Sequence, residues 1–223
     1  MLKTLVIAPH PDDELIGCGG ILLRRHFEGA TIGWLIVTEI SEDHGWNVDQ
    51  VRKRDEEIET VRCGLGIDEN HLFQLGYPTT KLDVVPKADL IQKISAVFNE
   101  FCPEEVLMPH QSDVHSDHQV VFDSVVACTK WFRYPFVKRI LAYECLSETD
   151  YNLNFYNQFQ PNYYVDITNY LDKKVELLKL YKTEIGDFPF PRSETAIRAL
   201  SQLRGSQSGF MGAEAFQLLK ERL

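Results

Sequence analysis

A histidine and three consecutive acidic residues follow the first apolar run of this chain. The run LVIA at residues 5–8 has the composition of a buried strand, and the sequence HPDDE occupies residues 10–14 directly after it. Adjacent carboxylates repel one another and contribute nothing to a hydrophobic core. We therefore expect a positively charged group to lie against this segment.

A second group of histidine and aspartate residues occurs in the middle of the chain. The sequence HQSDVHSDH at residues 110–118 follows the apolar run VLM at residues 106–108, which is another expected strand. In an open parallel sheet, ligands bind at the carboxyl ends of the strands, where the strand order reverses. We therefore expect both groups to open onto the same edge of one sheet.

The residue types in the two groups are those that bind Zn²⁺. His10 and Asp13, three positions apart across a strand-to-helix turn, can reach one ion together. A third ligand from the second group would complete a site with one position left for water. A remaining carboxylate would then act as general base, and a remaining histidine as acid or oxyanion partner. A single HxxD or HxDH pattern is common on protein surfaces, so the prediction of a metallohydrolase depends on their joint occurrence after two strands.

The elements that must position these groups alternate between strands and helices. Short apolar runs predict strands at residues 5–8, 32–37, 71–75, 106–108, 140–143 and 163–167. Near-continuous apolar strands that alternate with helices indicate a parallel sheet covered on both faces. We predict an α/β fold, a Rossmann-like three-layer α/β/α arrangement with a mostly parallel sheet and a C-terminal α/β extension. Residues 1–223 are expected to form a single domain.

Several segments between the strands have the spacing of amphipathic helices. Apolar residues recur with helical spacing from Pro86 to residue 101, and residues 49–65 carry alternating charge with apolar side chains on one side. Thr168 is expected to be the N-cap of a further helix. The expected buried face of that helix consists of Leu171, Val175, Leu178 and Lys182. The sequence GDFPFP at residues 186–191 predicts a loop, which would wall a pocket or pack in a homo-oligomer interface, and we favour the interface.

Composition excludes several classes of protein. The formal net charge of −10 argues against nucleic-acid binding, which needs clustered Lys and Arg. No apolar run approaches the roughly 18 residues of a membrane span, and the N-terminus lacks the features of a signal peptide. The five cysteines are odd in number and widely spaced, which favours reduced thiols and a cytoplasmic location.

The motifs resemble those of the LmbE-like, or PIG-L, family of zinc-dependent N-deacetylases. This family includes N-acetylglucosaminyl-phosphatidylinositol de-N-acetylase and the deacetylases of mycothiol and bacillithiol synthesis. The resemblance rests on APHPDDE at residues 8–14, GCGG at 17–20, RxxE at 54–57, LG at 65–66 and PHxxDxHxDH at 109–118. The final third is similar through VDI at residues 165–167, RG at 204–205 and AEAF at 213–216.

The resemblance implies a role for most acidic and histidine residues of the two motifs. His10, Asp13 and His118 would hold one zinc ion per chain. Asp12 would be the general base that deprotonates the zinc-bound water. Glu14 is expected to stabilise the N-terminus of the following helix, where a negatively charged side chain is favourable.

The remaining implied roles concern the reaction and the substrate. His115 would stabilise the oxyanion or protonate the leaving amine. Asp117 would orient that ring and raise its pKa, because a carboxylate beside an imidazole favours the charged form. Arg54 and Arg204 are the expected substrate contacts.

We therefore expect a zinc-dependent hydrolase that removes acetyl from an N-acetylated amino sugar or a soluble sugar conjugate. The alternative is a catalytically silent, zinc-containing module that binds sugar. The retained Asp12 favours the enzyme, because a binding module does not need a general base beside its metal.

Overall fold

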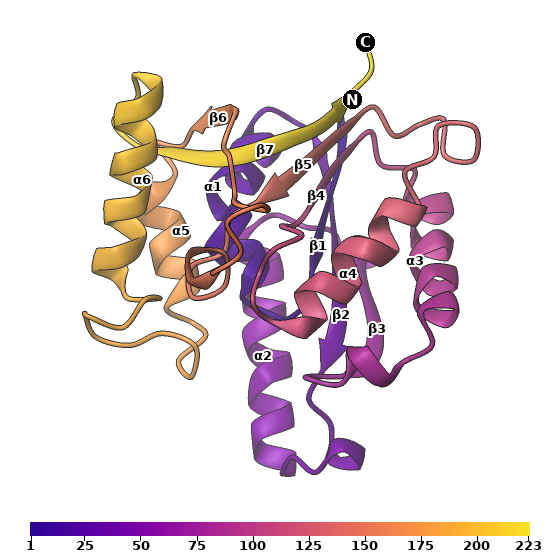
Figure 1. The fold of residues 1–223 in the computed structure, drawn as a ribbon. Helices are drawn as coiled ribbons and strands as arrows, with labels where there is room; N and C mark the ends of the chain where they lie inside the picture. Colours follow the sequence, from indigo (N-terminus) through magenta and orange to yellow (C-terminus); the bar gives the residue numbers. More distant parts are fainter.

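A computed structural model describes residues 1–223 and contains one sheet of seven strands between two layers of helices (Figure 1). The strands are β1 (Lys3–Ala8), β2 (Thr31–Glu39), β3 (Leu72–Pro78), β4 (Glu105–Pro109), β5 (Arg139–Tyr143), β6 (Tyr163–Asp166) and β7 (Ala213–Glu221). The helices are α1 (Asp13–Phe27), α2 (Val48–Gly64), α3 (Lys87–Phe101), α4 (Ser116–Ala127), α5 (Leu171–Leu178) and α6 (Glu194–Ser208). All six strands expected from the sequence are present, and the predicted α/β fold is confirmed.

The strand order is β3-β2-β1-β4-β5-β7-β6, so the chain changes direction across the sheet between β1 and β4. The first five strands run parallel, and β1 pairs with both β2 and β4. This doubly wound order places the carboxyl ends of β1 and β4 side by side at the switch point, where such folds bind ligands. The two motif segments follow these two strands, as the sequence predicted.

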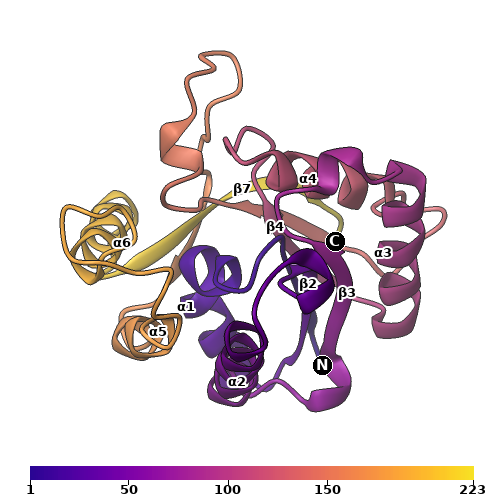
Figure 2. The same ribbon diagram turned by 90° about the horizontal axis from the view of Figure 1, so that it is seen from below.

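The two faces of the sheet carry separate hydrophobic cores. Alternate residues of β1 face opposite layers: Val6 packs with the core under α1, α2, α5 and α6, and Leu5 packs with the core under α3 and α4. Figure 2 shows these two groups of helices on either side of the sheet. Both faces are therefore buried, which explains why the parallel strands are apolar without alternation.

Close packing of α1 on the sheet requires glycine. A Cβ atom at Gly17 would lie 2.4 Å from Cδ2 of Tyr143 on β5. The Tyr143 hydroxyl in turn donates to the carbonyl of Ile7 at 2.9 Å, which fixes the ring below α1. The GCGG sequence therefore serves helix-to-sheet packing at the start of the helix that carries Asp13.

The helix in the last third begins later than the sequence predicted. The N-cap of α5 is Tyr170 and not Thr168. The Asp166 carboxylate accepts the N–H and the hydroxyl of Thr168 at 2.9 and 2.6 Å, which holds Thr168 in a turn. Because α5 ends at Leu178, Lys182 lies beyond the helix and is not part of its buried face.

The C-terminal strand β7 was not predicted, and it completes the sheet. It pairs antiparallel with both β5 and β6, which gives the mixed C-terminal extension. The carboxylate of Glu214 on β7 accepts the N–H groups of Gly20 and Ile21 at 2.7 Å each, and Lys174 of α5 donates to it at 2.7 Å. The C-terminal strand is thereby fixed to the helix that leaves the HPDDE segment.

Two further predictions from composition concern cysteines and membranes. The five cysteines are all free thiols. None of the helices combines the length and apolar character required to cross a bilayer.

The segment between β5 and β6 projects from the body of the molecule (Figure 2). Three large apolar side chains on it are exposed, namely Leu153, Phe155 and Tyr156.

A buried carboxylate connects the amino ends of the central strands, at the edge of the sheet opposite the motifs. Glu105 of β4 is fully buried and accepts hydrogen bonds from Thr4, Arg25 and Arg139 at 2.9 to 3.1 Å. Burial alone would raise the pKa of Glu105, but the two guanidinium groups outweigh it and lower the pKa.

We predict that Glu105→Gln lowers the free energy of unfolding at pH 7 by about 3 kcal/mol, because two arginines lose their buried partner. A depressed carboxylate pKa stabilises the protein above the unfolded value of 4.5 and loses this effect as pH falls through the folded value. The difference between wild type and variant in urea unfolding should therefore shrink below pH 4.5. Glu104→Gln, which breaks a more exposed pair with Lys138, should cost less than about 1 kcal/mol. A difference that persists unchanged in acid would contradict this account.

Candidate metal centre and active site

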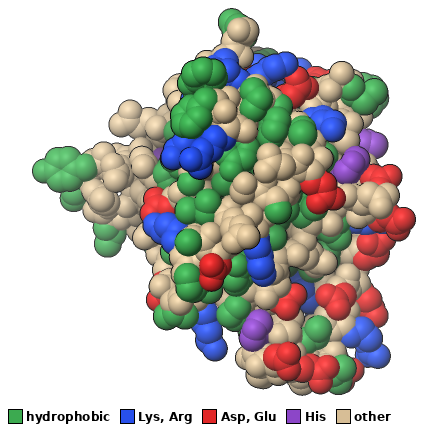
Figure 3. All heavy atoms as spheres, turned by 90° about the vertical axis from the view of Figure 1, so that its right-hand side faces the viewer, with side chains coloured by type: hydrophobic (Ala, Val, Ile, Leu, Met, Phe, Trp, Pro, Cys, Tyr) green, Lys and Arg blue, Asp and Glu red, His purple; other side chains and the backbone are tan.

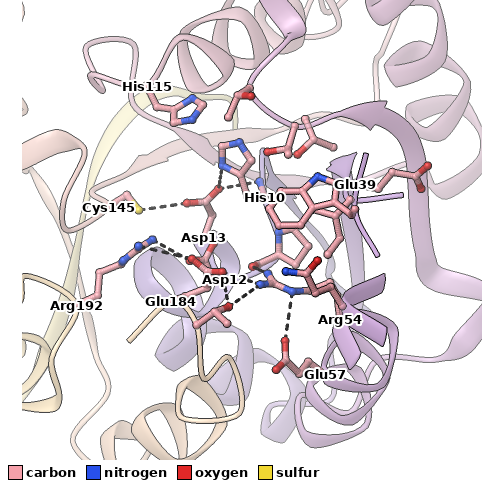
Figure 4. A pocket seen from close by; sticks show the side chains of 18 of the residues that line it. His10, Asp12, Asp13, Glu39, Arg54, Glu57, His115, Cys145, Glu184 and Arg192 are labelled. Atoms are coloured by element: carbon pink, nitrogen blue, oxygen red, sulfur yellow. Dashed lines mark hydrogen bonds and ion pairs between the residues drawn. The ribbon is translucent and has the colours of Figure 1, made fainter. Parts of the chain in front are cut away.

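A cavity of about 450 Å³ opens at the switch point of the sheet (Figure 4). Its floor is formed by the turn that enters α1, residues 10–13, and by His115 and His118 at the start of α4. The side walls come from the segment after β2, from α2, from the segment after β3 and from the loop before α6. Segments far apart in the sequence therefore surround the two motifs.

The three predicted ligand residues, His10, Asp13 and His118, converge on this floor. Oδ2 of Asp13 lies 3.4 Å from Nδ1 of His10 and 3.2 Å from Nε2 of His118. One ligand atom from each of the three residues lies within 4.8 Å of the others. Two imidazole nitrogens and one carboxylate oxygen form the donor set that zinc takes in catalytic sites. The residues present therefore fit a zinc ion.

Each of these histidines is held on its far nitrogen by a buried carboxylate. Nε2 of His10 is 3.0 Å from Oδ2 of Asp117, and Nδ1 of His118 is 2.9 Å from Oδ2 of Asp113. A carboxylate accepts only, so it fixes the ring proton on its own side. The other nitrogen of each ring faces Asp13, and loss of its proton would leave a lone pair there for a metal ion, the arrangement found in metal-binding histidines.

The electrostatics of the cluster favour a cation. Burial lowers the pKa of His10, but hydrogen bonds to Asp117 and Asp13 outweigh it and raise the pKa to about 9. The pKa of His118 is likewise raised, since the charge of Asp13 and the bond to Asp113 overcome burial. The buried carboxylates that raise the pKa of the two histidines create a negative electrostatic potential. This potential would also stabilise a bound divalent cation.

A second set of possible ligands, His10, His115 and Asp117, lies beside the first. Both carboxylate oxygens of Asp117 are already engaged, because the N–H groups of Thr80 and Leu82 donate to them at 2.7 and 3.0 Å. Asp117 is therefore better placed to hold His10 than to bind an ion, and we favour the first set.

Asp12 lies at the cavity in a strained conformation. Its φ of 140° is unusual for a residue with a side chain. Its N–H donates to Oε2 of Glu14 at 3.0 Å, and the hydroxyl of Tyr181 donates to Oε1 at 3.1 Å. Glu14, fully buried in the first turn of α1, therefore supports the backbone of Asp12, and this hydrogen bond lies at the helix terminus where the sequence placed the role of Glu14.

The Asp12 carboxylate is buried and faces one guanidinium group. The residue is 3% exposed, and Nη1 of Arg192 donates to its Oδ2 at 3.1 Å. Burial and the charge of Asp13 raise the pKa of Asp12, Arg192 lowers it, and the result is about 7. A carboxylate with a pKa near neutrality suits a general base.

The environment of His115 differs from the prediction. The Asp117 carboxylate does not bond to the His115 ring; instead the backbone N–H of Asp117 donates to its Nδ1 at 3.1 Å. Burial lowers the pKa of His115, and His10 and His118 lower it further, which outweighs the opposing effect of Asp117. The expected increase in the His115 pKa is therefore wrong. The neutral ring carries its proton on Nε2, since Nδ1 acts as an acceptor.

The two arginines expected to contact substrate lie in different places. Arg54 lines the cavity but is held by Pro11, Thr183, Glu184 and Glu57. Arg204 lies outside this cavity, because Glu144 accepts two hydrogen bonds from it at 2.7 and 2.6 Å and draws it into the adjoining hollow. The structure thus does not bring Arg204 to the cluster.

Several residues at the site were not identified from the sequence. Asp113 lies within the second motif, where its spacing of five from His118 could have indicated the pairing. Four other lining residues come from loops, and no sequence motif around them indicates a role: Cys145, Glu148, Glu184 and Arg192. Cys145 donates to Oδ1 of Asp13 at 3.3 Å, and Glu148 accepts the N–H of His115 at 3.1 Å.

The fold and the cluster define a class of protein: a doubly wound α/β chain with a histidine–carboxylate centre at the switch point. The family model described as PIG-L, GlcNAc-PI de-N-acetylase, matches residues 5–129, which contain both motifs, and the chain belongs to this family.

The chain is also similar to individual proteins in sequence or in fold. Diacetylchitobiose deacetylase of Thermococcus kodakarensis is 25% identical over 227 residues, covering 97% of this chain and 83% of that protein. The structure of N,N′-diacetylchitobiose deacetylase from Pyrococcus horikoshii superposes with a TM-score of 0.77 at 20% identity, covering 98% of this chain and 84% of that one. The 4-carboxy-2-hydroxymuconate hydratase of Pseudomonas putida KT2440 has a TM-score of 0.75 at 15% identity, covering 100% and 98%. These structural likenesses show the fold, and the site must indicate the reaction.

We predict that Asp113→Asn weakens zinc binding about 10–100-fold, because His118 loses the carboxylate that orients its ring. Competition with a chromophoric chelator measures the affinity directly. Asp123→Asn, the same change in an exposed pair with Lys87, provides the matched control and should leave the affinity unchanged. Equal affinities for the two variants would exclude the proposed support of His118.

Proposed function

We propose that this protein is a zinc-dependent hydrolase that removes an N-acetyl group from an N-acetylated amino sugar or sugar conjugate, with one zinc ion per chain. The observation that carries the proposal is the convergence of His10, Asp13 and His118, each histidine held by a carboxylate, beside the buried base Asp12. The names of the related deacetylases support the same class of reaction.

His10, Asp13 and His118 would hold the ion. When bound, zinc lowers the pKa of a coordinated water and polarises a carbonyl group. Asp12 accepts a proton from the attacking water, and Arg192 holds its carboxylate in place. The oxygen of that water forms a bond to the acetyl carbon, and the carbonyl electron pair moves onto the carbonyl oxygen. The pair then returns as the C–N bond breaks, and the proton held by Asp12 passes to the leaving nitrogen, which gives acetate and an amine.

His115 would stabilise the negative charge that develops on the carbonyl oxygen. Its Nδ1 is occupied by the N–H of Asp117, so Nε2 of the neutral ring carries a proton that it can donate. A donor aimed at the developing oxyanion typically contributes a factor of about 10²–10³ to turnover.

The sugar-binding module is not favoured. The strained backbone of Asp12 costs of order 1–3 kcal/mol, and such strain is retained where a function needs it. Binding alone does not require a second buried carboxylate, held by Arg192, beside the proposed ligands. Incubation of the zinc-loaded protein with a panel of N-acetylated sugars, followed by measurement of free acetate, tests the proposal. Sugar binding without acetate release from any substrate would overturn it.

We predict that Asp12→Asn retains zinc but lowers kcat about 10²–10⁴-fold, the usual contribution of a positioned base. The amide has nearly the same shape but cannot accept the proton. Asp172→Asn, at a side chain that is 90% exposed in its pair with Arg198, is the control and should retain full activity. If Asp12→Asn is as active as the control, Asp12 is not the base.

A second prediction separates the two histidines at the start of α4. His118→Ala should lose most of its zinc after purification without chelator, because a ligand is removed. His115→Ala should keep about one zinc per chain and lose at least about 10²-fold in kcat. Elemental analysis and acetate release measure the two properties. The reverse pattern would place the ion between His10, His115 and Asp117 instead.

A further inference from the structure

The cavity wall contains three cationic side chains, Lys53, Arg54 and Arg192, and each of them is already paired with a carboxylate. Proteins commonly recognise an anionic substrate group with an arginine or lysine side chain that is free to bind it. The pairing of these three groups therefore bears on the charge of the substrate.

The donors of Arg54 are used in holding the walls together. Nη2 donates to Glu184 at 2.6 Å and to Thr183 at 3.1 Å, and Nη1 donates to the carbonyl of Pro11 at 3.0 Å. Nε lies 3.2 Å from Glu57. The guanidinium is also stacked 5.4 Å from the centre of the Tyr181 ring. The Arg54 guanidinium therefore connects α2, the HPDD turn and the segment after α5, and its donors are not free for a ligand.

The other two cations also face carboxylates, but more loosely than Arg54 does. Arg192 donates to Asp12 at 3.1 Å and lies 3.6 Å from Glu184, while its buried Nε has no acceptor. Lys53 is half-exposed and lies 3.7 Å from Glu57, the carboxylate that also faces Arg54. Glu57 and Glu184 thus neutralise the positive wall of the cavity.

Carboxylates outnumber the cations around the cavity. Six line it, namely Asp12, Asp13, Glu39, Glu57, Glu148 and Glu184, so a divalent ion on the floor leaves no excess of positive charge. The segment beside the entrance adds Glu42, Asp43 and Asp49, all exposed. Figure 3 shows acidic side chains gathered at this lower end of the molecule, around the turn Glu42–His44.

The remaining lining suits a polar but uncharged molecule. Trp46, 39% exposed, offers an aromatic face on one wall. Gln50 and Thr79 offer amide and hydroxyl groups that hydrogen-bond to hydroxyls. A sugar ring presents both an apolar face and hydroxyl groups.

We propose that the substrate is an electrically neutral N-acetylated sugar or oligosaccharide, and that anionic conjugates, such as sugar phosphates or carboxylates, are discriminated against. This inference rests on the proposed function and specifies its substrate class. Glu57 and Glu184 offset the positive charges of the wall, and the carboxylates in excess of the cations would repel an added anion.

The test compares methyl N-acetylglucosaminide with N-acetylglucosamine 1-phosphate, two substrates that differ in one charged group. We expect kcat/KM for acetate release to be at least about 10-fold higher for the neutral sugar at low ionic strength. The ratio should fall as salt screens the repulsion. A preference for the phosphate that weakens with salt would overturn the inference while leaving the deacetylase function intact. No acetate from either sugar, together with none from the wider panel, would overturn both.

A charge change on the wall tests the cause. Glu184→Gln frees Arg54 and Arg192 from their shared partner and should raise kcat/KM for the phosphate relative to the neutral sugar about 5-fold or more. Glu56→Gln removes the same charge from an exposed position of α2 outside the cavity and should not change the ratio. Glu57→Gln is the second variant if Glu184→Gln does not fold. An unchanged ratio in a folded wall variant would show that the ion pairs do not determine selectivity.

Discussion

The pairing of two histidines with two buried carboxylates is the constraint on which the site depends. Asp113 and Asp117 fix the ring protons of His118 and His10 on the sides away from Asp13. The other nitrogen of each ring faces Asp13, and loss of its proton would direct both lone pairs to one point on the floor of the cavity. Without these carboxylates, each ring could rotate or exchange its proton, and the three ligand atoms would not converge.

The same constraint explains why the chain tolerates so many acidic residues at one place. Each acid of the HPDDE motif has a different partner: Asp13 faces the histidines, Asp12 faces Arg192, and Glu14 accepts the N–H of Asp12. Repulsion between neighbouring carboxylates is thereby offset by separate hydrogen bonds and charges. The separation also gives the two aspartates different environments, which separates a ligand from a base.

The walls of the cavity follow a different principle from its floor. On the floor, carboxylates exceed cations and attract a metal ion. On the walls, Glu57 and Glu184 cancel the charges of the arginines and Lys53, so that the charged side chains hold the walls together. Ion pairs that connect α2 with the segment after α5 keep the entrance in one shape, and they leave recognition to uncharged groups.

The sequence by itself determined the sheet, its parallel core and the position of the chemistry. Strand runs and the HPDDE and HSDH motifs are local patterns, and the rule that parallel strands present their carboxyl ends at one edge places His10, Asp13 and His118 together. Only the tertiary structure decided which carboxylate serves which histidine: Asp117 is two residues from His115 yet holds His10, because the segment after β3 clamps it with two N–H groups. The tertiary structure also decided that Arg54 and Arg204 pair with Glu184 and Glu144, and that β7 lies between β5 and β6. The partners of these residues and of β7 lie far away in the chain. Side-chain pairing across a cavity depends on the packing of distant segments, and no local spacing in the sequence encodes it.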